Sequence, residues 1–284
     1  MFRNKKKINS IGIPWKILTY IFLAFMIGVA VFPAIWMLST SIKNATEQYD
    51  VPPQIIPDFP TIGNFESVLT NSKMFDAFAN SAIITFFVVS ITLLVSILAG
   101  YGLCRFKFKG SGLIKVALLF GQMIPGVVLI IPLYFLVAKT KLLDTHFSLI
   151  VSDLALTIPM GVIMLSSFFE TVPKELEESA KLDGCTGISA LFRVVLPIAK
   201  PGLISVAIYT FIHSWEEFLF ALNLSTSTNT RTLPIAINMF AGEFSVDWGA
   251  TMAASAVVAL PVLAVFLACN KYFVKGLADG AVKG

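Results

Sequence analysis

The chain is organised as long apolar runs separated by shorter polar segments. Four runs contain no Asp, Glu, Lys or Arg, and they cover residues 17–42, 77–104, 116–138 and 248–270. Each is longer than the roughly 20 residues that a helix needs to cross the apolar core of a bilayer. Two further runs, at about 147–169 and 198–222, are of similar length but contain acids. The pattern therefore predicts six membrane-spanning helices.

Composition also favours an integral membrane protein of the all-α class. Hydrophobic residues make up 56% of the chain and charged residues 13%, which leaves too few polar side chains to cover a water-soluble surface. The mean hydropathy of +0.82 agrees with this. We expect a six-helix transmembrane bundle over residues 17–272, preceded by a cytoplasmic segment at 1–16 and followed by a cytoplasmic tail at 273–284.

Lys and Arg are distributed unevenly between the segments that connect the apolar runs. If the N-terminus is cytoplasmic, sixteen of the 21 basic residues lie on the cytoplasmic side. The outer segments hold only Lys43, Lys73, Lys139, Lys141 and Arg231. This bias follows the positive-inside rule and predicts that both termini are cytoplasmic. It also accounts for the net charge of +4, so the charge gives no case for a nucleic-acid partner.

The cysteines and histidines give no case for disulfides or metals. On this topology Cys104, Cys185 and Cys269 all face a reducing compartment, which predicts free thiols. No C-x-x-C pair occurs, and His146 and His213 are the only histidines, so we expect no metal site. Both histidines are interpreted as packed or interfacial side chains.

The segment 171–197 predicts two short helices joined at a glycine elbow. Thr171 and Pro173 suit a first helical turn, and the acids that follow favour a helix N-terminus. Those acids are Glu175, Glu177 and Glu178. Gly184 can take the left-handed conformation that ends a helix, and a second short helix would then follow. A helix lying in lipid headgroups is the alternative, but anionic lipids would repel three acids, so a groove of another protein is the better host.

Within this segment, Glu178-Ser179-Ala180-Lys181-Leu182-Asp183-Gly184 and the later Leu196-Pro197 resemble the coupling loop of binding-protein-dependent ABC importer permeases. This chain has Ser179 where that family usually has Ala. Further segments are similar to the carbohydrate-uptake, maltose-type branch of the family. They lie at residues 51–65, 122–125, 131–134, 231–234, 247–249 and 272–284. The resemblance therefore covers almost the whole chain.

The resemblance implies a transport subunit and not an enzyme. In the family the coupling helix docks into a cleft of a cytoplasmic ATPase. By resemblance the coupling positions are Glu178, Ser179, Ala180, Asp183, Gly184, Leu196 and Pro197. The implied partners are a second homologous permease, two cytoplasmic ATPase subunits that bind ATP and Mg, and an extracytoplasmic solute-binding protein. The implied cargo is a sugar or oligosaccharide, and the implied location is a prokaryotic cell membrane with its lipids. The chain contains no G-x-x-x-x-G-K-[ST] phosphate loop, so ATP is expected on the partners.

Acidic and aromatic residues inside the predicted spans are candidates for the substrate path. A charge at the centre of a membrane helix costs at least about 2.5–3.5 kcal/mol, so Glu216 and Glu217 should face the bundle interior or a wet cavity. The family usually has Trp-Asn where this chain has Trp215-Glu216, and a carboxylate there would accept hydrogen bonds from sugar hydroxyls. Trp215 and Phe218 offer faces for sugar rings, although packing is the simpler role for aromatic residues in a bundle. Asp153 is interpreted either as a cavity residue or as a satisfied acid near a helix end.

Other functional classes make different predictions. An ion-coupled secondary transporter would move protons through Asp153 or Glu216, and its transport would survive ATP depletion. An intramembrane enzyme would need a paired nucleophile and base, and no such pair is evident. Several prolines inside the predicted spans are expected to bend helices, which suits a gate but also occurs in static bundles. They are Pro125, Pro132, Pro159 and Pro261.

Overall fold

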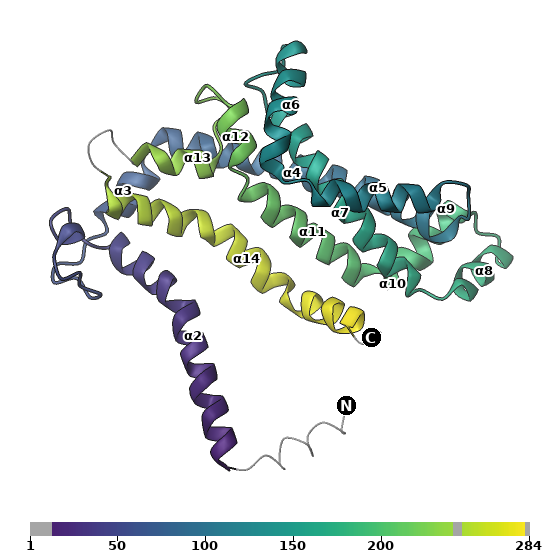
Figure 1. Cartoon of the computed structure of the whole chain (residues 1–284), viewed down its shortest axis with the longest axis horizontal. Helices are drawn as coiled ribbons and strands as arrows, with labels where there is room; N and C mark the ends of the chain where they lie inside the picture. Colours follow the sequence, from purple (N-terminus) through teal and green to yellow (C-terminus); the bar gives the residue numbers. More distant parts are fainter. Residues whose placement is uncertain (1–12, 241–245, 282–284) are drawn as a thin grey trace. The chain divides into compact units, whose positions relative to one another are not determined.

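The computed structural model describes residues 13–240 and 246–281, and these ranges consist of helices and their connections without a β-strand (Figure 1). The expected all-α class is therefore confirmed. The described residues belong to two compact units. One draws on Met1–Thr70 with Phe240–Val257, and the other on Asn71–Met239 with Val258–Gly284.

The first unit contains a long apolar helix and an irregular loop. Helix α2 (Ile13–Ser41) is followed by the 3₁₀ turn η1 (Glu47–Tyr49) and by α3 (Gly63–Leu69). Apolar side chains are exposed along most of α2, as expected for a helix whose surroundings are lipid or another subunit. Helix α14 (Trp248–Ala281) begins in this unit and continues past residue 273, where we expected the tail to start.

Side-chain hydrogen bonds organise the loop that contains the proline-rich segment 51–60. A carboxylate oxygen of Glu47 accepts a hydrogen bond from the backbone N–H of Phe59 at 2.9 Å. The side-chain amide of Asn64 donates to the backbone carbonyls of Ser41 and Lys43 at 2.9 and 2.8 Å. Because proline lacks an N–H donor, this segment cannot pair as a central strand and depends on such contacts.

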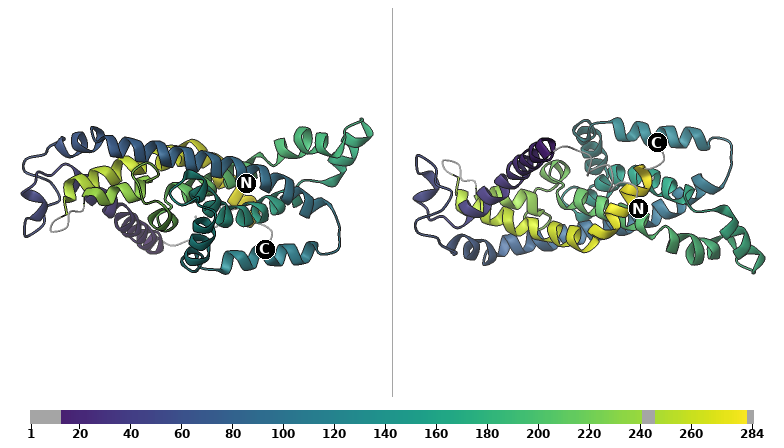
Figure 2. Two further views of the ribbon diagram at one scale, coloured as in Figure 1. Left: turned by 90° about the horizontal axis from the view of Figure 1, so that it is seen from above. Right: turned by 90° about the horizontal axis from the view of Figure 1, so that it is seen from below.

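The second unit is built around three long helices. They are α4 (Ser72–Arg105), α7 (His146–Glu170) and α11 (Lys200–Trp215). The other helices of this unit are α5 (Ser111–Met123), α6 (Gly126–Lys139), α8 (Lys174–Leu182), α9 (Gly187–Ala190), the π-helical turn η2 (Leu191–Val195), α10 (Leu196–Ile198), α12 (Leu219–Leu224) and α13 (Leu233–Ile237), which leads into the 3₁₀ turn η3 (Asn238–Phe240). Figures 1 and 2 both show α4, α7 and α11 side by side.

Small residues let these three helices approach closely. A side chain at Gly161 of α7 would place its Cβ 2.4 Å from the hydroxyl oxygen of Ser96 on α4. Nearby, the buried hydroxyls of Thr92 and Thr157 form a hydrogen bond of 2.9 Å between the same two helices. Small residues and hydroxyl pairs are the usual means by which membrane helices associate, because lipid gives little hydrophobic drive between them.

The predicted spans are present, but two of them are not straight helices. Among the residues that the structure describes, four single helices are long and apolar enough to cross a membrane. The number rises to six if each of two bent pairs, α5 with α6 and Gly187–Ile198 with α11, counts as one span. The run at 116–138 is divided into α5 and α6, which meet at 100°. The break falls at Ile124 and Pro125, where the residue before a proline is extended because the ring excludes its helical conformation. Of the other prolines expected to bend helices, Pro132, Pro159 and Pro261 lie inside helices.

The run at 198–222 also differs from the prediction of one continuous helix. Helix α11 ends at Trp215, and α12 starts at Leu219 after a short break. The Glu217 carboxylate accepts hydrogen bonds from the backbone N–H groups of Phe220 and Ala221, at 2.7 and 2.9 Å. These are N–H groups that the first turn of a helix leaves unpaired, so the acid stabilises the start of α12. Glu216 and Glu217 thus lie at a helix break and not at a helix centre.

Candidate functional site

The segment 171–197 forms the expected pair of short helices with a glycine elbow. Helix α8 ends at Leu182, and Gly184 has a φ of +89°, which is in the left-handed region. The backbone N–H of Cys185 donates to the carbonyl of Ala180 at 2.9 Å and closes the helix end. Thr171 differs from expectation, because it ends α7 and does not enter the first turn of α8.

Most positions assigned to ATPase coupling lie on the exposed side of this segment. The exposed ones are Glu178, Ser179, Asp183, Gly184 and Pro197. Ala180 differs, since it is only 8% exposed and packs inward. Leu196 is partly buried against the apolar cluster beneath the segment. The structure therefore places five of the seven residues where another protein can contact them.

Large apolar side chains are exposed beside these positions. Leu182 is 89% exposed and Ile188 is 71% exposed, one on each side of the Gly184 elbow. Exposed apolar residues next to exposed acids are typical of a surface that another protein covers. The second short helix also contributes to the core, because Leu191 and Val195 are buried.

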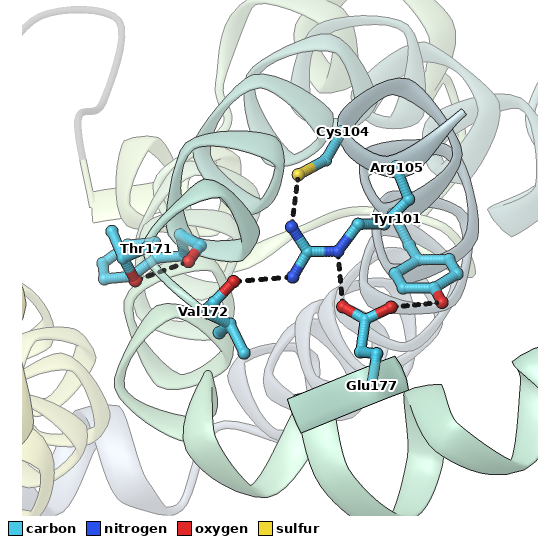
Figure 3. Close-up of polar contacts among 7 residues, drawn as sticks. Tyr101, Cys104, Arg105, Thr171, Val172 and Glu177 are labelled. Carbon is cyan, nitrogen blue, oxygen red and sulfur yellow. Dashed lines mark hydrogen bonds and ion pairs between the residues drawn. The ribbon is translucent and has the colours of Figure 1, made fainter. Parts of the chain in front are cut away.

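A buried ion pair ties this segment to α4 (Figure 3). The guanidinium of Arg105, the last residue of α4, pairs with the carboxylate of Glu177 on α8. The Tyr101 hydroxyl donates to the other oxygen of that carboxylate at 2.9 Å. Arg105 also donates to the backbone carbonyl of Val172, at 2.8 Å, in the turn between α7 and α8.

This cluster was not predicted from the sequence. Glu177 was expected only at a helix N-terminus together with Glu175 and Glu178, and Arg105 was expected only among the basic residues on the cytoplasmic side. The one local signal is that Glu177 lies three residues before Ala180, on the same helix face, and both are buried. Arg105 and Glu177 are 72 positions apart, so no local pattern pairs them.

A second candidate region lies where α11 ends. Trp215 is buried, stacks on Phe211 at a centroid distance of 5.6 Å, and meets the edge of Phe78. Its indole N–H donates to the backbone carbonyl of Val258 at 3.1 Å. Trp215 and Phe211 also border an open groove of about 340 Å³ along α4. The α4 residues on this groove are Ala82, Thr85, Phe86, Val89 and Ser90.

The acids of this region take different positions. Asp153 is 2% exposed and accepts a hydrogen bond of 2.6 Å from the Ser214 hydroxyl, so α7 and α11 satisfy it between them. Of the two interpretations of Asp153, the structure favours the satisfied acid. Glu216 is exposed in this chain and does not face its interior, and Phe218 is partly exposed at the start of α12. Trp215, Glu216 and Phe218 are adjacent, whereas the Asp153 side chain is enclosed by the bundle.

The two histidines contact neighbouring polar or aromatic side chains, and the three cysteines are unpaired with one another. His146 forms a hydrogen bond of 2.9 Å with the Asn80 side chain, and the His213 ring lies 6.0 Å from the Tyr209 ring. Both side chains are partly buried, which agrees with the interpretation of packed or interfacial histidines. Cys104, Cys185 and Cys269 are free thiols, as predicted.

These features define a polytopic helical protein with an exposed glycine elbow, and comparisons with known proteins give its family. The family described as "Binding-protein-dependent transport system inner membrane component" matches residues 92–279. The sulfoquinovosyl glycerol transport system permease protein SmoH of Agrobacterium fabrum is 35% identical over 95% of this chain and 94% of its own length. The diacetylchitobiose uptake system permease protein DasC of Streptomyces coelicolor is 34% identical over 98% of this chain and all of its own length. The chain belongs to the family of binding-protein-dependent transport system inner membrane components.

A solved structure has the same fold. It is a crystal structure of a bacterial ABC transporter involved in the import of the acidic polysaccharide alginate. The match has a TM-score of 0.78 at 20% identity and covers 96% of this chain and 99% of the other. At this identity the likeness supports the fold.

Proposed function

We propose that this chain is one of two permease subunits of an ATP-driven ABC importer, and that the cargo is a sugar or oligosaccharide. An extracytoplasmic binding protein delivers the cargo, and two cytoplasmic ATPase subunits drive transport. Relatives named for the uptake of sulfoquinovosyl glycerol and diacetylchitobiose support the cargo class. The open groove beside Trp215 supports a second permease, which would cover it in the assembled importer.

The observation that carries the ATPase coupling is the exposed elbow of the 171–197 segment. Glu178 and Asp183 present charges there, and Gly184 lets the backbone turn without a side chain in the way. Apart from its two neighbours in the chain, none of the described residues has an atom within 4 Å of the place where a Cβ at Gly184 would be. A partner backbone can therefore approach this point closely. ATP binding would move the elbow and switch the path from inward-open to outward-open. ATP hydrolysis would then return the path to the inward-open state.

The orientation of the chain belongs to the same proposal. With cytoplasmic termini, Cys104, Cys185 and Cys269 label from the cytoplasmic side only with a membrane-impermeant thiol reagent. Labelling of Cys185 from outside intact cells would show the opposite topology, in which the elbow cannot contact a cytoplasmic ATPase.

Uptake assays test the whole proposal. In cells that express the complete importer, sugar uptake should stop when ATP is depleted while the proton gradient is held constant. Uptake that follows the proton gradient and ignores ATP would support the ion-coupled alternative through Asp153 or Glu216. A panel of sugars offered to the purified binding protein, scored by thermal shift, then identifies the cargo.

A further inference from the structure

The 171–197 segment is attached to the three long helices in two different ways. It continues directly from α7, which ends at Glu170, and it leads directly into α11, which starts at Lys200. It has no such covalent continuity with α4, since α5, α6 and α7 lie between them in the chain. A displacement of the segment therefore reaches α4 only through noncovalent contacts.

One polar contact of this kind is the buried Arg105–Glu177 ion pair, in which the two side chains are 7% and 5% exposed. Both carboxylate oxygens of Glu177 are engaged, one by the Arg105 guanidinium and the other by the Tyr101 hydroxyl. Arg105 also donates a hydrogen bond to the Val172 carbonyl, so one side chain contacts both α8 and the turn before it. Figure 3 shows these groups converging from α4 and from the segment.

Apolar side chains pack around the ion pair and enclose it. The Tyr101 ring meets the Phe169 ring edge to face, at 6.1 Å and 88°. Tyr101 and Phe169 share a buried cluster with Val172, Leu191 and Val195. A buried ion pair adds little stability over an apolar pair of the same volume, but it fixes one geometry, because each charge is costly without its partner. The pair is therefore better suited to holding two elements in register than to stabilising them.

Helix α4 connects this contact to the groove beside Trp215. Thr85 and Ser90 line the groove, and α4 contains no proline between them and Arg105. The 20 residues from Thr85 to Arg105 rise about 30 Å along the helix axis. A helix without a break transmits a displacement over that distance because its backbone hydrogen bonds resist bending.

We propose that Tyr101, Arg105 and Glu177 form the joint through which the 171–197 segment moves α4, and with it one wall of the groove. These are positioning residues for transport, and the inference rests on the proposed function of the segment. The joint passes the movement of the ATPase partner to the substrate path, while α7 and α11 move because the chain connects them directly. A claim of this kind needs a measured coupling, because spatial intermediacy alone does not establish it.

The test uses the complete importer reconstituted in proteoliposomes, with the native cysteines replaced by serine and a reporter thiol introduced by Ser90→Cys. Ser90 is exposed on the groove and lies on α4. Labelling of this thiol is measured without nucleotide and in the ATP-bound state, in the background and in Glu177→Gln and Tyr101→Phe. The matched control is Glu170→Gln, which removes an exposed ion pair of 3.2 Å with Lys115 at the same end of α7.

In the background and in Glu170→Gln, ATP should change the labelling rate. Glu177→Gln keeps an amide oxygen that can accept a hydrogen bond from Arg105, so this variant should still assemble with the ATPase and hydrolyse ATP. Because the charge is lost, the ATP-dependent change in labelling should disappear. Transport per ATP should fall by about tenfold, within the range of typical coupling factors. Tyr101→Phe keeps the ion pair, so it should reduce the ATP-dependent change in labelling and the transport per ATP by a smaller amount.

Two results would overturn the joint. One is an unchanged ATP-dependent labelling of Ser90→Cys in Glu177→Gln. The other is a lower yield of assembled complex with normal transport per ATP, which would make the cluster a structural brace. If Glu177→Gln does not assemble, Tyr101→Phe decides by the same two measurements. Failure of the proposed function is recognised separately, because the background complex itself would then show no binding to the ATPase and no response to ATP.

Discussion

Two carboxylates lie in the chain beyond the two ends of α7, and they are held in opposite ways. Beyond its C-terminal end, Glu177 is buried and is held by the guanidinium of Arg105 and a tyrosine hydroxyl. Before its N-terminal end, Asp144 is partly exposed and accepts hydrogen bonds from neutral donors in the turn 226–230. The first carboxylate connects helices by charge, and the second fastens one loop to another by hydrogen bonds. The difference predicts that the first end is sensitive to charge and the second to the loss of an acceptor.

The pKa of Asp144 shows the effect of neutral donors. Desolvation raises the pKa of its carboxyl, but hydrogen bonds from the turn 226–230 together lower it further, so the net pKa lies well below the usual range. Its backbone N–H also donates to the Leu224 carbonyl at 2.9 Å. Asp144 has a φ of +59°, a conformation that Asp tolerates better than most residues. This end is therefore a local loop contact.

The largest expected effect is that of Arg105→Ala. The substitution leaves the Glu177 carboxylate buried without its cation, which should cost about 3–5 kcal/mol. We expect a sharp loss of folded subunit, measured as yield and thermal stability in detergent. The double substitution Arg105→Met with Glu177→Leu should recover the yield, since an apolar pair packs without a charge, but transport should stay low. Recovered transport in the double variant would show that the ion pair is dispensable.

The next effect concerns the elbow between the two short helices. Gly184→Pro cannot adopt the φ of +89°, and Glu178→Lys reverses an exposed charge at the proposed ATPase contact. Both variants should insert into the membrane but lose substrate-stimulated ATP hydrolysis in the reconstituted complex. Gly184→Asn is the matched control, because Asn tolerates a positive φ, and it should keep most of the activity. Stimulated hydrolysis near the wild-type level in both loss variants would remove the elbow from the mechanism.

A smaller, pH-dependent effect is expected at the other end of α7. Asp144→Ala removes an acceptor of several hydrogen bonds and should cost about 1–2 kcal/mol, because the site is partly open to solvent. Since the folded pKa lies below the unfolded value of about 3.9, the carboxylate contributes stability above that value. The contribution is lost as the pH falls further toward the folded pKa. The difference in thermal unfolding between wild type and Asp144→Ala should therefore be constant from pH 7 down to about pH 4 and should narrow as the pH falls below that value, and a difference that stays constant below pH 4 would contradict the hydrogen-bond account.

The smallest effect is expected at Glu216, beside the helix break. If this exposed carboxylate binds sugar hydroxyls in the assembled importer, Glu216→Leu should reduce transport more than Glu216→Gln, which keeps an acceptor. Both variants should retain ATP hydrolysis that does not depend on substrate. If the group is a pairing residue instead, both should mainly lower the amount of assembled complex. Equal transport per complex in wild type and both variants would leave Glu216 without a role in binding.

The helical spans and the elbow were predictable because their signals are local. An uninterrupted apolar run of sufficient length predicts a membrane helix wherever it occurs, and α2, α4, α7 and α14 follow the predicted runs. The elbow was equally predictable, since a glycine after a short acidic helix favours a left-handed end, and Gly184 has it. The breaks were less predictable. A bend at Pro125 was expected from the proline, but its angle of 100° and the end of α11 at Trp215 needed coordinates, because hydropathy does not distinguish a bent span from a straight one.

What the sequence alone determined is thus the class of protein, the apolar runs, and the exposed elbow, all of which depend on residues close together in the chain. Only the tertiary structure decided which polar groups meet inside the bundle. Glu177 pairs with Arg105, which is 72 positions away in the sequence, and Asp153 accepts a hydrogen bond from Ser214, which is 61 positions away. The physical reason is that a buried polar group must be paired wherever the fold brings a partner, and the partner's place in the sequence does not enter that requirement.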